Sequence, residues 1–150
     1  MTETNPTLEK TFTITRIFDA PRAAIWRAWT DPDEAAAWWH PRGLETPRDS
    51  VHLDVRPGGT YAYTMVAPDG SSYPTAGTYR EVEEPSRLVF TWADPGDPDA
   101  LAPVITVTLE DLGQRTRMVF HVDGIGGQPG DEDVYDGWDS AFDVLADRLA

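Results

Sequence analysis

DEDVYDGWDSAFDVLADRLA (131–150) is the stretch that decides the fold, because it predicts one long amphipathic helix. Its apolar residues recur at spacings of four and three and form a single stripe: Val134, Trp138, Phe142, Leu145 and Leu149. Three acids at 131–133 and Arg148 near the other end both complement the helix dipole. A helix with one apolar face must cover another layer, so the remainder of the chain has to supply that layer.

Most of the preceding sequence alternates between apolar and polar residues, which is typical of β-strands. Turn signals such as Pro57-Gly58-Gly59, Pro68-Asp69-Gly70 and Gly113-Gln114 separate the alternating runs by short connections. Short connections indicate antiparallel neighbours. We therefore predict about seven strands, mostly antiparallel, within residues 10–20, 51–55, 60–66, 75–84, 87–92, 103–112 and 115–123.

Two short helices fit between the first two strands. Pro21 suits the first position of one helix, in which Trp26 and Trp29 share a face with Ile25. The run Asp31-Pro32-Asp33-Glu34 resembles a capping box that opens the next helix. The fold class is therefore α+β: a sheet that curls, a long helix across its concave face, and two short helices that fill the remaining gap.

Length and composition limit the class of protein. The 150 residues are predicted to form one domain over residues 10–150, with an N-terminal tail at 1–9. The chain lacks cysteine, a secretory signal and any apolar run of the ~20 residues that a membrane helix needs, so we expect a cytoplasmic protein. A net charge of −14 repels phosphate backbones and anionic lipid surfaces, so neither nucleic acid nor membrane is an expected partner.

Catalytic and metal-binding signatures are weak in this sequence. Nucleophile-elbow, P-loop and zinc-protease motifs are all missing. The three histidines, His40, His52 and His121, do not have the spacing of metal ligands, and the acids Asp94, Asp97 and Asp99 match a calcium loop only loosely. We therefore predict no metal, no cofactor and no catalytic residue.

One polar stripe leaves two interpretations open. His52, Asp54 and Arg56 alternate with apolar residues on one predicted strand, so they share a face. Solvent exposure is the favoured interpretation. The alternative is that they face a cavity and orient a polar head group or act in acid–base chemistry.

Aromatic residues supply the candidate ligand site. Eight of them converge between the sheet and the last helix: Trp38, Tyr61, Tyr63, Phe90, Trp92, Phe120, Trp138 and Phe142. They form either an ordinary core or the wall of an apolar pocket. Within the cluster WRAWTDPDEAAAWWHP (26–41), we expect Trp38 to point into the cavity mouth and Trp39 to rest on the surface or on the next loop. Gly137 either packs closely against a neighbouring element or leaves room in the cavity.

The motifs resemble a known superfamily. They are FDAPRAAIWRAWTDPDEAAAWW (18–39), VRPGG (55–59), PDGSSYPTAGTYREVEEPSRLVF (68–90) and GWDSAFDVLADRL (137–149). In this order they are similar to the START-like (SRPBCC) superfamily, and most similar to AHSA1-type single-domain proteins related to the C-terminal domain of the Hsp90 ATPase activator. The resemblance covers residues 10–150 and implies a helix-grip fold, whose cavity takes apolar or amphipathic ligands in many members.

We therefore expect a module that binds a small hydrophobic or amphipathic molecule, without assigned catalysis. Two alternatives stay open: an Hsp90-associated or stress-response protein, and a cyclase- or hydrolase-like enzyme that uses His52 or a pocket tyrosine. The Hsp90 activator has a further N-terminal domain for which 150 residues leave no room, so the Hsp90 link is the less favoured expectation. Formation of a homodimer also stays open.

Overall fold

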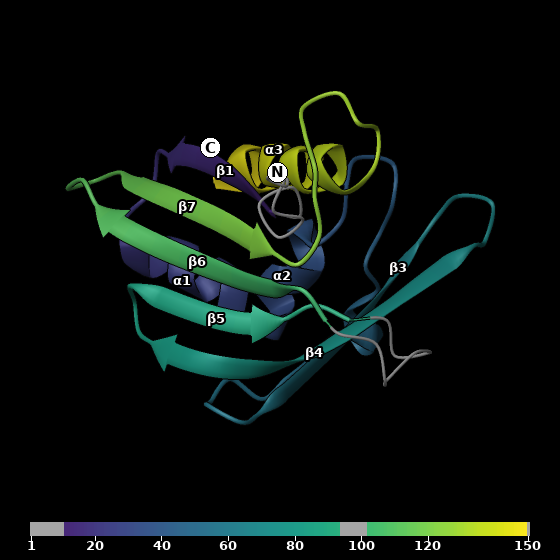
Figure 1. Ribbon diagram of the computed structural model, residues 1–150, viewed down its shortest axis with the longest axis horizontal. Helices are drawn as coiled ribbons and strands as arrows, with labels where there is room; N and C mark the ends of the chain where they lie inside the picture. Colours follow the sequence, from purple (N-terminus) through teal and green to yellow (C-terminus); the bar gives the residue numbers. More distant parts are fainter. Residues whose placement is uncertain (1–10, 94–101, 150) are drawn as a thin grey trace, which may run out of the picture.

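The computed structural model describes residues 11–93 and 102–149, and its main layer is one antiparallel sheet of seven strands in the order β1-β7-β6-β5-β4-β3-β2 (Figure 1). Its strands are β1 (Thr11–Phe18), β2 (His52–Leu53), β3 (Thr60–Val66), β4 (Ser72–Glu83), β5 (Arg87–Thr91), β6 (Val104–Asp111) and β7 (Thr116–Asp123). All seven predicted strands are present. β2 is shorter than predicted, and β4 begins three residues earlier, at Ser72. The predicted tail (1–9) and the acids Asp94, Asp97 and Asp99 lie outside the described residues.

Within the described ranges, three α-helices and one 3₁₀ turn accompany the sheet: α1 (Arg22–Thr30), α2 (Pro32–Trp38), the turn Arg48–Ser50, and α3 (Val134–Leu149). Pro21 is the N-cap of α1 rather than its first helical residue. Asp31 caps α2 as predicted, because its Oδ1 accepts the backbone N–H of Asp33 at 2.9 Å. Glu34 does not complete the capping box, and instead accepts a hydrogen bond from Nε of Arg148 at 3.1 Å. No helix in the described part of the chain could cross a membrane.

The sheet bends within β4. Residues 72–78 of this strand pair with β3, whereas Tyr79 and the residues after Arg80 pair with β5, with a register shift between Tyr79 and Glu81. Such irregularities increase local twist and curvature. At the bend, a Cβ on Gly77 would lie 2.0 Å from the backbone oxygen of Thr91. Glycine is therefore required here for the close approach of two backbones.

The helices lie on the concave face of this curved sheet, as the helix-grip fold requires (Figure 1). Trp29 of α1, which is 1 % exposed, is at the centre of the core. Its ring lies within 6.3 Å of six other aromatic rings, those of Trp38, Trp39, Phe90, Phe120, Trp138 and Phe142. One side chain thus joins all three helices to the sheet.

Candidate functional site

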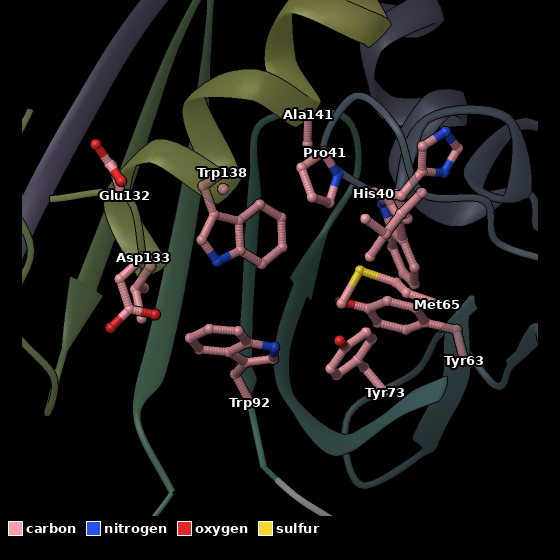
Figure 2. Close-up of a pocket in the computed structure, with 14 residues that line it drawn as sticks. His40, Pro41, Tyr63, Met65, Tyr73, Trp92, Glu132, Asp133, Trp138 and Ala141 are labelled. Atoms are coloured by element: carbon pink, nitrogen blue, oxygen red, sulfur yellow. The ribbon is translucent and has the colours of Figure 1, made fainter. Parts of the chain in front are cut away.

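A pocket of about 440 Å³ opens between the N-terminal end of α3, the segment after α2 and the β3–β4 hairpin (Figure 2). Its wall is mostly apolar, and its lining residues are Trp39, His40, Pro41, Leu44, Tyr63, Met65, Tyr73, Trp92, Glu132, Asp133, Val134, Gly137, Trp138 and Ala141. Exposed residues, including Tyr73 at 48 %, mark its opening to solvent. Volume and lining both match small-molecule sites, which occupy roughly 300–1,000 Å³.

Two tryptophans form one side of the pocket. Trp92 follows β5, Trp138 lies in the first turns of α3, and their ring centroids are 5.6 Å apart in an edge-to-face arrangement. Trp138 also packs on Phe120 of β7, with centroids 4.7 Å apart, so its position is fixed by the core. Figure 2 shows both indoles on one side, with Met65, Tyr63 and Tyr73 on the other.

Tyr63 supplies a buried polar group to the opposite side. Burial raises the pKa of its phenol to about 12, while hydrogen bonds to the side chains of Thr75 and Trp92 act in the other direction. The hydroxyl is therefore protonated at neutral pH. Its hydrogen-bond partners hold the ring beside Trp92 and restrict that part of the wall.

Gly137 lies on the pocket wall with open space beside it. An added Cβ would meet nothing within 4 Å, so close packing against a neighbour does not explain this glycine. Glycine within a helix costs roughly 1 kcal/mol relative to alanine. The missing side chain leaves part of the pocket open.

Two carboxylates organise the loop at the pocket mouth. Asp131 accepts hydrogen bonds from the backbone N–H groups of Gln128, Asp133, Tyr135 and Asp136. Asp136 accepts two more, from the N–H groups of Gly130 and Glu132. These bonds hold Glu132 in a left-handed conformation (φ 53°) and fix the start of α3. Burial acts to raise the pKa of Asp131, but its backbone hydrogen bonds outweigh this and lower it.

His40 borders the pocket but does not aim its ring into it. Its Nδ1 lies 3.1 Å from Oγ1 of Thr46, which itself donates to the backbone oxygen of Trp39 at 2.7 Å. Figure 2 shows the imidazole turned away from the space between the tryptophans. Burial lowers the pKa of His40, which favours the neutral ring at pH 7.

Three of the eight aromatic residues expected at a ligand site line this pocket: Tyr63, Trp92 and Trp138. The others, Trp38, Tyr61, Phe90, Phe120 and Phe142, are buried in the core and are not on its wall. Tyr61, for example, donates its hydroxyl to the backbone oxygen of Thr91 at 2.6 Å.

The structure reverses the expected positions of Trp38 and Trp39. Trp38 is completely buried and donates its Nε1–H to the carbonyl oxygen of Ala28 at 2.8 Å. Trp39, 4 % exposed, lines the pocket and lies 4.8 Å from the ring of Tyr63. Sequence reasoning also missed Tyr73, because β4 begins earlier than its alternation indicates.

The polar stripe that begins in β2 and continues in the segment after it does not line this pocket. His52, Asp54 and Arg56 are exposed, which confirms the favoured interpretation, and Arg56 pairs with Asp54 at 2.9 Å. His52 and Asp54 border a second hollow, of about 830 Å³, where β3 and β4 present small residues such as Ala62 and Ala76. His121 is partly exposed, with Nδ1 2.8 Å from Oγ1 of Thr13.

Comparison with known proteins relates this chain to one family of proteins. The family model of the activator of Hsp90 ATPase homolog 1-like proteins matches residues 19–150. Among solved structures, a protein from Chromobacterium violaceum is 26 % identical with a TM-score of 0.82, and the match covers 93 % of this chain and 96 % of that one. An AHSA1 protein from Silicibacter pomeroyi is also 26 % identical, with a TM-score of 0.75 and the same coverage.

An HSP90 activator from Plasmodium falciparum has the same fold, with a TM-score of 0.60 and 19 % identity over 79 % of this chain and 76 % of that one. No curated protein matches the sequence.

Proposed function

This chain belongs to the family of activator of Hsp90 ATPase homolog 1-like proteins, and we propose that it binds a small hydrophobic or amphipathic molecule in the aromatic pocket. The observation that carries the proposal is Gly137, which keeps the wall of a 440 Å³ pocket open at a position where a side chain would meet no neighbour. Retaining glycine there costs helix stability and yields no packing in return.

The composition of the wall supports an apolar ligand. Trp92 and Trp138 offer ring surfaces on one side, and Met65 offers a flexible side chain on the other. Tyr63 and Tyr73 add hydroxyl groups at two positions, which can orient one polar group of a ligand. The proposal assigns no reaction to the site.

A graded series at Gly137 tests the proposal. N-phenyl-1-naphthylamine, an uncharged dye that fluoresces in apolar sites, is titrated into wild-type protein and into Gly137→Ala and Gly137→Leu. We expect saturable binding by the wild type, little change for alanine, and at least a tenfold loss for leucine, whose side chain fills the pocket. Circular dichroism checks that the leucine variant remains folded. Equal dye binding by all three proteins would place the dye elsewhere and refute the proposal.

Association with Hsp90 is a second candidate, supported by the family membership. Pull-down of purified Hsp90 and stimulation of its ATPase activity test it directly. Stimulation by both wild type and Gly137→Leu would favour this candidate and show that it does not need the pocket.

A further inference from the structure

The pocket has an uneven distribution of charge. Glu132 and Asp133 stand at one end, and Pro41, Leu44 and Met65 line the other. Among the described residues, no arginine or lysine lines the pocket, and neither of the two carboxylates has a hydrogen-bonding or ion-pair partner for its side chain. The acidic end of the pocket is therefore uncompensated.

Two aromatic rings, those of Trp92 and Trp138, lie on the side of one of these carboxylates (Figure 2). Figure 2 shows the carboxylate of Asp133 on the side of Trp92, whereas that of Glu132 points away from the cavity. Trp92 and Trp138 present faces and edges at a centroid distance of 5.6 Å. The faces of aromatic rings attract cations, and a nearby carboxylate adds to that attraction. A site that combines both is suited to bind a quaternary ammonium group.

From this arrangement we propose that the ligand is a cationic amphiphile. Its ammonium group lies among Asp133, Trp92 and Trp138, and its apolar chain extends toward Leu44 and Met65. An anionic head group at this position would meet the unpaired carboxylate of Asp133, with no arginine or lysine on the pocket wall to compensate for it. This inference rests on the proposed function and adds the charge and the orientation of the ligand.

The attraction of a cation by the net charge of the whole protein must be separated from its attraction by Asp133 and the two indole rings. A net charge of −14 attracts any cation at long range, but salt at 0.15 M limits that field to about 8 Å. Glu83 provides a matched control, because it is an exposed acid that ends β4 and does not line the pocket. The β4–β5 turn that follows it lies at the other end of β4 from the β3–β4 hairpin (Figure 1). Glu83→Gln and Asp133→Asn change the net charge equally.

Three molecules with the same decyl chain test the proposal by calorimetric titration in 0.15 M salt: decyltrimethylammonium, 1-decanol and decanoate. We expect the cation to bind about tenfold more tightly than the alcohol, and decanoate to bind most weakly. Asp133→Asn and Trp92→Leu should remove most of the preference for the cation while both variants still bind 1-decanol. Glu83→Gln should bind all three as the wild type does.

The possible results separate the two proposals. Equal binding of all three compounds, or tightest binding of decanoate, would overturn the cationic assignment and leave the hydrophobic pocket in place. A cation preference that Asp133→Asn and Glu83→Gln reduce equally would also overturn it, since net charge would then be the cause. Failure of every compound to bind would refute the proposed function itself.

Discussion

Arg16 of β1 and Asp143 of α3 lie 127 residues apart in sequence and are joined by a hydrogen bond of 2.6 Å between Nη2 and Oδ1. The same nitrogen also donates to Oδ1 and to the backbone oxygen of Asp139, at 2.9 and 3.0 Å. The half-buried guanidinium of Arg16 thus links α3 to β1, which is an edge strand of the sheet.

Replacing Arg16 by methionine should therefore lower the free energy of unfolding by about 1 kcal/mol, since the two aspartates are nearly half exposed. Chemical denaturation measures this change. Arg117→Met is the control, because its ion pair with Glu110 joins exposed groups on neighbouring strands, and a change of at most a few tenths of a kcal/mol is expected. If the two variants lose the same stability, Arg16 has no special role in holding α3.

The two adjacent tryptophans at the end of α2, Trp38 and the C-cap residue Trp39, should respond differently to the same substitution. Trp38→Phe removes the indole donor and leaves the carbonyl of Ala28 buried without its partner, which costs about 1–3 kcal/mol beyond the lost volume. Trp39→Phe removes an N–H group that has no hydrogen-bond partner among the described residues, so it should cost less. Urea denaturation of the pair tests this order, and a larger loss for Trp39→Phe would contradict it.

Gly77→Ala should be severely destabilising. Its Cβ would collide with backbone at the bend of β4, and backbone cannot move aside as a flexible side chain can. We expect a loss of more than about 3 kcal/mol in the free energy of unfolding. Gly137→Ala is the opposite case and should stabilise the protein by about 0.5–1 kcal/mol, because the new methyl group meets open space in a helix. Thermal unfolding of both variants measures the contrast.

Alkaline pH should destabilise the protein through its buried tyrosines. Burial raises the pKa of Tyr63 from 10.0 to about 12, and it also raises the pKa values of Tyr61 and Tyr79. Between pH 10 and 12 the unfolded chain loses the proton of Tyr63 while the folded chain retains it, so the free energy of unfolding falls as pH rises.

The contribution of Tyr63 to this pH dependence can be measured separately from those of Tyr61 and Tyr79. Tyr63→Phe should show a shallower fall in the free energy of unfolding above pH 10, because phenylalanine cannot ionise. Urea denaturation between pH 8 and 11.5 measures the slope. An unchanged slope in the variant would show that Tyr63 does not contribute to it.

The sequence was sufficient for the fold because its signals are local. Alternation and turn residues located every strand, and Asp31 located the start of α2. The position of α3 on the concave face then followed from the need to cover its single apolar stripe, whereas the pairing of β1 with β7, 98 or more residues later in the chain, has no local signal.

The pocket wall was harder to predict, because it depends on where helices end and where strands bend. α2 ends at Trp38, and Trp39 leaves the helical path with φ −74° and ψ 60°. The angle of 100° per residue therefore gave the wrong direction for Trp39. Tyr61 and Tyr63 share a strand face, but only Tyr63 lines the aromatic pocket, and alternation carries no information about that difference.

β4 connects the β3–β4 hairpin to the main part of the sheet. Its first half carries Tyr73 on the hairpin wall of the pocket, and its second half pairs with β5 in the main body of the sheet. A change in curvature at Arg80 would swing the hairpin relative to α3 and alter the width of the pocket without replacing any lining side chain. The width of the pocket therefore depends on the curvature of the β4 backbone as well as on the side chains that line the wall.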